Sequence, residues 1–414
     1  MIGGFKRLTE GFRLRGNIYV ALALSLLLLM ALYMVCRIGF YFYNSTFFPG
    51  MTLVRFEKIM VGGLRFDLSA ILYLNSLFLL LLIVPFAFRF RPGYLKAIKY
   101  IFLVINSLGL AANVADAMYY QYTLRRTTLG VMRQFENEQN IGGLMVSFFV
   151  DYWYAILFWA VLVMVMVQAY KKIKIEGPQL KNKLTSYAGG SFTMLLIAGL
   201  VVAGMRGGFG ESTRPITLSN AAQYATTPKD INLVLNTPFA VLRTAKTPVI
   251  EKVNYFSSEA EVEKLFTPLH VPNDTVAFQS QNVVVIILES FSKEFLGAYN
   301  RDLGKDYQGY TPFLDSLISV SNSFQYSMAN GRKSIDAMPS IICSIPSIEV
   351  PFVLSHFSGN KINSLPSLLS EKGYYSAFFH GAPNGSMGFD AFANQSGFND
   401  YFGKDEYNNN DDFD

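Results

Sequence analysis

The chain has 414 residues, of which 51% are hydrophobic, 15% are aromatic and only 16% are charged. This charge content is low for a soluble protein and ordinary for a membrane protein, and the length predicts two or three domains. The formal net charge of +5 lies in short segments beside apolar runs, where it sets orientation in a bilayer. Nucleic-acid binding is therefore not expected.

Five apolar runs occupy the first half of the chain, each about 20 residues long and able to cross a hydrocarbon core of roughly 30 Å. They cover residues 18–42, 66–88, 97–119, 147–170 and 186–206. The first run is too long for a cleavable signal peptide, and no small-residue cleavage site follows it. We therefore expect a five-helix transmembrane domain over residues 1–206.

Basic residues fix the expected orientation of these spans. They gather before the first span, between the second and third, and between the fourth and fifth: Lys6, Arg7, Arg13, Arg15; Arg89, Arg91, Lys96, Lys99; Lys171, Lys172, Lys174, Lys181 and Lys183. The positive-inside rule predicts a cytoplasmic N-terminus, and five spans then place the chain after residue 207 outside the cytoplasm. The predicted location is the cell (inner) membrane.

Two sets of polar residues lie at the predicted outer interface. Arg65 and Asp67 begin the second span, where they could bind a lipid headgroup or form an interfacial ion pair. The basic loop with Arg125, Arg126 and Arg133 could bind anionic lipid or simply be solvated. Both alternatives stay open for each set.

Residues 207–276 are predicted to form an extracytoplasmic linker. Proline recurs in this stretch and hydrophobic periodicity is weak, which is typical of a connector. A short helix is expected over residues 257–266, where serine precedes early glutamates. The soluble domain then occupies residues 277–414.

Strands alternate with helices in this soluble domain. Expected strands cover residues 282–288, 324–328 and 374–379, expected helices cover 311–317 and 365–373, and residues 330–339 form a loop that opens a short helix. This alternation predicts an α/β domain with a mostly parallel, doubly wound sheet. Ligands of such sheets collect at the carboxyl ends of the strands.

Three polar residues, Glu289, Ser334 and His380, fall at or just beyond the expected strand ends. A carboxylate can hold a hard divalent cation, and a serine hydroxyl at a helix N-terminus can attack phosphorus. Lys333 or Arg332 could neutralise phosphate oxygens, with arginine better suited to bidentate contact. Taken singly, Glu289 could be a surface turn residue, Ser334 a helix cap and His380 a partner of a neighbouring loop. Their common position favours a functional site.

These segments resemble the lipoteichoic acid synthase family, within the alkaline phosphatase and sulfatase superfamily. The similar stretches are residues 285–290, 311–315, 331–336 and 379–381, together with five spans before an extracytoplasmic domain. The resemblance implies a multi-pass α-helical membrane bundle followed by an α/β sulfatase-like (alkaline phosphatase-type) domain. The specific motifs lie within about residues 282–400.

The resemblance also implies roles for single residues. Glu289 matches the glutamate that binds manganese or magnesium in the family; zinc is less expected. Ser334 stands where the family has its threonine nucleophile, which is also a metal ligand. His380 matches the histidine that contacts the glycerol phosphate substrate, and Lys333 and Arg332 are the expected contacts to phosphate oxygens.

The sequence departs from the family pattern in two further places. Met387 and Phe389 stand near the positions of the family's tryptophan and arginine, so the headgroup recognised could differ from phosphoglycerol. No Asp-His pair follows His380, and about half of the expected sheet is present, so we expect a C-terminally truncated product with an incomplete metal site. Sulfatases of the superfamily carry their catalytic cysteine or serine in a Cys/Ser-x-Pro-x-Arg pattern. Residues 343–347 lack this pattern, which disfavours sulfate ester hydrolysis.

The expected activity is metal-dependent transfer of a phosphoglycerol-type headgroup. The donor would be a membrane phospholipid, the acceptor an extracytoplasmic glycan or glycolipid, and the intermediate a covalent adduct on Ser334. Two alternatives remain: a phosphoethanolamine transferase, and a catalytically inactive membrane protein that binds lipid or glycan.

Overall fold

The computed structural model describes most of the chain. The described residues are 14–129, 150–175, 183–209, 215–227, 229–245, 253–267, 279–304, 307–324, 326–331, 333–348, 350–355 and 357–407. They form two compact units, one made of Met1–Pro248 with Met338–Asp414 and the other of Val249–Ala337. Each unit is described by itself.

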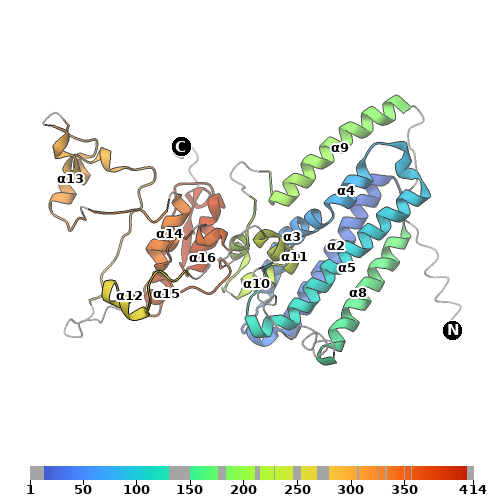
Figure 1. The fold of residues 1–414 in the computed structure, drawn as a ribbon, viewed down its shortest axis with the longest axis horizontal. Coiled ribbons are helices and arrows are strands. Elements are labelled where there is room, and N and C mark those ends of the chain that lie inside the picture. Colours follow the sequence, from blue (N-terminus) through green and yellow to red (C-terminus); the bar gives the residue numbers. More distant parts are fainter. Residues whose placement is uncertain are drawn as a thin grey trace. The chain divides into compact units, whose positions relative to one another are not determined.

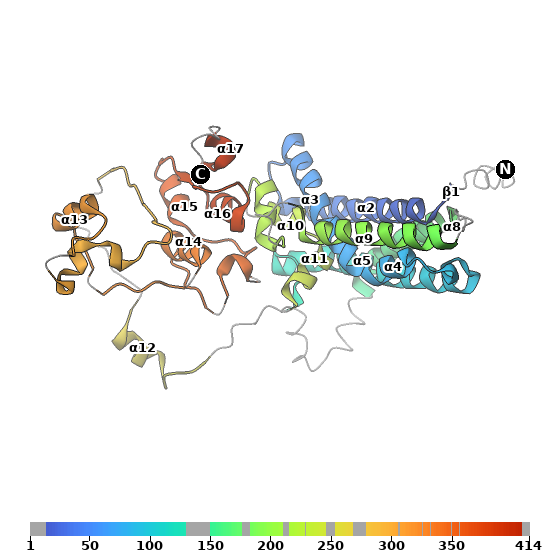
Figure 2. The same ribbon diagram turned by 90° about the horizontal axis from the view of Figure 1, so that it is seen from above.

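Long apolar helices dominate the first unit (Figure 1). Among the described residues, four helices are long and apolar enough to cross a membrane: α2 (Ile18–Tyr43), α5 (Pro92–Thr123), α8 (Trp153–Lys172) and α9 (Lys183–Arg206). Helices α2, α5 and α8 run side by side (Figure 1), and Figure 2 shows α2 and α5 from above. The Asn17 side chain caps α2 by accepting a hydrogen bond from Val20 N, and Pro92 occupies the first turn of α5.

The predicted second span, residues 66–88, is a bent helix pair and not one straight helix. Helix α3 (Leu53–Leu74) and helix α4 (Ser76–Ile83) meet at an angle of 66°. Asn75 lies at the break, and its amide exchanges hydrogen bonds of 2.9 and 2.7 Å with the amide of Asn106 on α5. This buried pair supplies partners where regular helix bonding is interrupted.

Residues 215–245, predicted to be part of a surface linker, are instead folded onto the helices. They contain η4 (Leu218–Tyr224), α10 (Asp230–Val234) and α11 (Thr237–Thr244). Helix α10 packs against α3, and α11 packs against α3 and α5. The apolar side chains of this segment that are fully buried include Ile231, Leu233, Val234, Phe239 and Ala240. The first unit therefore extends well beyond residue 206.

Buried arginine–aspartate pairs fix this segment. Arg37 forms a bidentate pair with Asp67 and donates to the carbonyls of Leu233 and Val234. Arg55 pairs with Asp230 at 2.6 Å. A Cβ on Gly63 would lie 2.3 Å from the Arg37 guanidinium carbon, so glycine is needed for this close crossing.

Arg126 completes the set of pairs. Its guanidinium lies 3.1 Å from Asp116, which also accepts a hydrogen bond from the hydroxyl of Thr237. Since Arg126 is buried and paired, the idea that it serves as a free cation for anionic lipid is wrong. The Arg65–Asp67 ion pair is wrong as well, because Asp67 pairs with Arg37 while Arg65 donates to the carbonyl of Gly207.

The C-terminal part of the first unit is a small β-α-β arrangement. Strands β3 (Ala377–Phe379) and β4 (Asp400–Phe402) are parallel, with Ala377 opposite Asp400, and α16 (Phe389–Gln395) lies between them in sequence. Helix α15 (Leu365–Ser370) precedes β3 and has a capping box at Ser364; α17 (Lys404–Tyr407) follows β4. A second parallel pair joins β1 (Leu14–Gly16) to β2 (Ile173–Ile175). The expected parallel α/β pattern is present around residues 365–402.

The second unit contains two helices, α12 (Glu259–Leu265) and α13 (Pro312–Ser319), and several single 3-10 turns. Helix α13 begins where Thr311-Pro312 predicted it. The strands expected at residues 282–288 and 324–328 are not formed in the described part of this unit. Residues 282–288 have no regular secondary structure and are exposed, and a strand without a neighbouring strand cannot satisfy its backbone groups in a sheet.

Candidate functional site

His380 lies directly after β3, at the carboxyl end of a parallel strand. Its backbone N–H donates to the carbonyl of Phe402 at 2.8 Å, which continues the pairing with β4. Its Nδ1 is 2.7 Å from the hydroxyl of Tyr401. The centroid of its ring lies 4.5 Å from that of Phe389. The imidazole is thus held on one ring nitrogen and against one aromatic ring.

The protonation of this pair follows from its surroundings. Burial lowers the pKa of His380 below its ordinary value, so the imidazole is neutral at neutral pH. Burial, helped by Asp390 and Glu406, raises the pKa of Tyr401, so the phenol keeps its proton. If the phenol donates to Nδ1, the tautomer carries its proton on Nε2, for which the described residues provide no hydrogen-bond partner. The Nε2–H can then donate to an anionic oxygen of a ligand.

The loop between β3 and α16 has an unusual backbone. Gly385, Met387 and Gly388 all have positive φ, and Met387 does so at 48° without being a glycine. Asn384 ties the loop to α17 through hydrogen bonds of 3.0 and 2.8 Å to Glu406. These bonds lower the pKa of Glu406, which stays a carboxylate. A positive φ at a residue such as Met387 persists only where the surrounding contacts hold the backbone, and the hydrogen bonds from Asn384 to Glu406 are such contacts.

Phe389 does not replace the arginine that the resemblance leads one to expect near it. Its side chain is buried, at 7% exposure, and its ring packs against His380 and stacks on Phe378. The residue therefore supports the histidine and does not present a polar group to a ligand.

The 215–245 segment also packs against α16, through η4. Gln223 of η4 donates a 2.6 Å hydrogen bond to Asp390, and Asn394 donates to the carbonyls of Ala222 and Ala225. Burial raises the pKa of Asp390. Sequence reasoning missed Gln223, Asp390 and Tyr401, because nothing in a single sequence indicates contacts between residues 20 to 170 positions apart.

Ser334 is the first residue of α14 (Ser334–Cys343), as the sequence predicted. It is partly exposed, and Lys333 just before it is exposed. Asp336 accepts a hydrogen bond from Lys333 N at 3.2 Å and so caps this helix start. Gly331, with φ of 119°, approaches Asp336 so closely that a Cβ would lie 2.5 Å from it. Arg332 lies outside the described residues.

Glu289 is exposed and follows the apolar stretch 282–288. Its carboxylate accepts a 3.2 Å hydrogen bond from the hydroxyl of Ser290, a residue with φ of 51°. Glu289, Lys333 and Ser334 belong to the unit Val249–Ala337, and His380 belongs to the other unit. The described residues contain no group of three or more His, Cys, Asp or Glu side chains able to hold a metal ion. The described donors therefore do not make up a complete divalent-metal site.

Two protein-family models match this chain. Residues 15–247 match the lipoteichoic acid synthase N-terminal domain, and residues 281–414 match the sulfatase family. The chain belongs to the lipoteichoic acid synthase family. Its fold is that family's helical membrane region followed by a sulfatase-like domain. Comparison with curated proteins and with solved structures gave no match.

The match to the lipoteichoic acid synthase N-terminal domain ends where the first compact stretch ends. Its last residue, 247, lies next to Pro248, so the 215–245 segment belongs with the membrane helices in this family. The two matches together support an enzyme of phosphotransferase or hydrolase type, anchored in a membrane by apolar helices.

Proposed function

We propose that this protein transfers a phosphoglycerol-type headgroup from a membrane phospholipid to a hydroxyl of a glycan or glycolipid. The observation that carries the proposal is the environment of His380. A neutral imidazole, fixed by Tyr401 and Phe389 at the end of β3, offers one N–H to an anionic oxygen. Membership of the lipoteichoic acid synthase family supplies the reaction class.

The proposed reaction has two balanced steps. In the first, the Ser334 oxygen forms a bond to phosphorus while the bond from phosphorus to the diacylglycerol oxygen breaks. Serine loses its proton in this step, and the leaving diacylglycerol oxygen gains one. In the second, an acceptor hydroxyl attacks the same phosphorus, and Ser334 leaves and regains a proton. Lys333 and Arg332 neutralise phosphate oxygens, and His380 donates to the phosphoglycerol group.

A divalent cation, Mn²⁺ or Mg²⁺, is part of the proposal, with Glu289 and Ser334 as its candidate ligands. Such an ion would favour the deprotonated serine and the phosphate charge. Glu289 and Ser334 alone do not make up a complete ligand set, and the described residues offer no group of three or more His, Cys, Asp or Glu side chains for the ion.

The proposed topology follows the charge distribution between the spans. With the N-terminus in the cytoplasm, the sulfatase-like domain faces the outside of the cell membrane. The donor headgroup and the acceptor glycan would both be available on that side. No step requires nucleic acid.

A headgroup-transfer assay tests the proposal. The protein is reconstituted in vesicles containing phosphatidylglycerol labelled in its acyl chains, and released labelled diacylglycerol is measured. Ser334→Ala should abolish release, while Ser334→Thr should retain it because both residues offer a hydroxyl. Ser319→Ala on α13 is the matched control, since the Ser319 hydroxyl only donates to the carbonyl of Ser316. Full release by Ser334→Ala would overturn the mechanism, and release only from labelled phosphatidylethanolamine would change the headgroup.

A further inference from the structure

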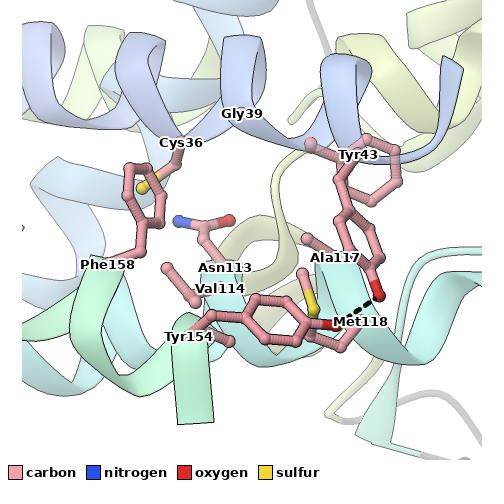
Figure 3. A pocket seen from close by; sticks show the side chains of 11 residues that line it. Cys36, Gly39, Tyr43, Asn113, Val114, Ala117, Met118, Tyr154 and Phe158 are labelled. Carbon is pink, nitrogen blue, oxygen red and sulfur yellow. Dashed lines mark hydrogen bonds between the residues drawn. The ribbon is translucent and has the colours of Figure 1, made fainter. Parts of the chain in front are cut away.

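An apolar groove lies between α2, α5 and α8, close to the end of α2 at Tyr43 (Figure 3). Its volume is about 190 Å³. Small residues on each helix make the space, and larger apolar residues line it: Gly39, Val114, Ala117, Met118, Ala155 and Phe158. All three helices are long and apolar enough to span a membrane.

The groove opens at the surface of the helices. Tyr43, Tyr154 and Phe158, which line it, are each more than a third exposed, whereas Ala117 and Ala155 at its base are buried. Tyr43 is the last residue of α2 and Tyr154 is the second residue of α8. The opening therefore lies at the end of two membrane spans. Tyrosine is enriched at this depth, where hydrocarbon gives way to headgroups.

The walls of the groove are fixed by hydrogen bonds and a cation–π contact of residues that line it. Asn113 accepts a hydrogen bond from Thr237 N at 3.0 Å and donates to the carbonyl of Gly109. The Arg126 guanidinium lies 3.7 Å above the ring of Phe40, whose side chain is also part of the wall. The hydroxyls of Tyr43 and Tyr154 are 2.9 Å apart across the opening. Asn113 thus joins α5 to α11, Arg126 packs on α2, and the tyrosine pair joins α2 to α8, so these contacts together hold the helices around the groove.

We propose that this groove binds one acyl chain of a membrane lipid, with the headgroup beside the Tyr43–Tyr154 pair. In a bilayer the opening faces hydrocarbon, and the lining is apolar except for groups that already have partners. An empty groove would leave its lining without van der Waals contacts, which a chain entering from the bilayer restores. No hydrophobic gain accompanies this transfer, so the preference for the groove comes from shape.

The site is independent of the proposed transferase reaction and concerns only the membrane helices. The probe for it is a phosphatidylcholine carrying a diazirine on one acyl chain, included in vesicles of phosphatidylethanolamine and phosphatidylglycerol. After illumination, labelled positions are mapped by peptide mass spectrometry on the full chain. We expect adducts concentrated on Phe158, Met118 and Val114, above the level on Leu108 and Val104, which are exposed on α5 outside the groove.

Variants that fill the groove test the shape argument from two walls. Ala117→Phe on α5 and Ala155→Leu on α8 should lower labelling of Phe158 roughly tenfold, because a chain forced into filled space is overpacked. Gly199→Leu on α9 is the control, since a side chain there meets nothing within 4 Å. The unaltered protein alone can overturn the proposal. It does so if Phe158 is labelled no more strongly than Leu108.

Discussion

Gln223 donates a 2.6 Å hydrogen bond to Asp390, and this bond joins the two regions that match different protein families. Gln223 lies in η4, folded on the membrane helices, and Asp390 is the second residue of α16. The residue before Asp390 is Phe389, whose ring packs on His380. The conformation around His380 is therefore supported by a segment of the membrane region.

Replacing Gln223 by alanine should weaken this support. Asp390 would lose its side-chain donor while remaining half-buried, which costs about 1–3 kcal/mol in the free energy of unfolding. We expect the thermal midpoint in detergent to fall and KM for the lipid donor to rise more than kcat falls. Lys229→Ala, at an exposed position of the same 215–245 segment, is the control; an equal effect of both changes would contradict the assignment.

Protonation of His380 gives a pH dependence of known sign. Burial places the pKa of His380 in the folded protein below the ordinary value of 6.5, so the unfolded chain takes up this proton first as pH falls. The contribution of His380 to stability is complete above about pH 6.5 and is lost progressively below it. Denaturation at pH 7.5 and 5.5 measures this loss.

The comparison with His380→Gln separates this residue from other titrating groups. Glutamine keeps a polar side chain but does not titrate, so the variant should lose less stability between the two pH values than the unaltered protein. Equal losses would mean that His380 is not held neutral by burial.

Tyr401→Phe should move the acid limb of the pH–rate profile, because it removes the hydrogen bond to Nδ1.

The sequence predicted the long helices well and the folded 215–245 segment poorly. Runs of about 20 apolar residues are a strong signal because a hydrocarbon core demands that length. The bend at Asn75 is a weak signal, since one asparagine hardly changes the hydropathy of the run. Burial of the 215–245 segment depends on partners such as Arg37 and Leu233, which are 196 positions apart.

For the candidate site, the sequence predicted the local positions of His380 and Ser334 but not the contacts that support them. His380 follows a strand and Ser334 opens a helix, as local patterns indicated. Their supporting contacts, such as Tyr401 beneath Nδ1, arise only when β3 and β4 pair. The apolar stretch 282–288 had the composition of a buried strand, but composition alone does not provide the neighbouring strand that pairing requires.

Arg126 should be far more important for stability than its neighbour in sequence. Arg126→Ala leaves Asp116 as a buried carboxylate without its cation, which costs about 3–5 kcal/mol. It also removes the contact with Phe40 on α2 and the hydrogen bond from Arg126 to the carbonyl of Asn232 on α10. Arg125→Ala, at a partly exposed position, should change stability by less than about 0.5 kcal/mol. Thermal unfolding in detergent decides; similar midpoints for the two variants would show that the buried pair is not structural.

The central claim is that Ser334 carries the headgroup during transfer. The most direct test is to incubate the reconstituted protein with phosphatidylglycerol in the absence of acceptor, quench it in acid, and measure the mass of the peptide containing Ser334. We predict an increase equal to one phosphoglycerol group, absent in Ser334→Ala and retained on threonine in Ser334→Thr. Diacylglycerol release without any adduct on this peptide, or an adduct that persists in Ser334→Ala, would contradict the account.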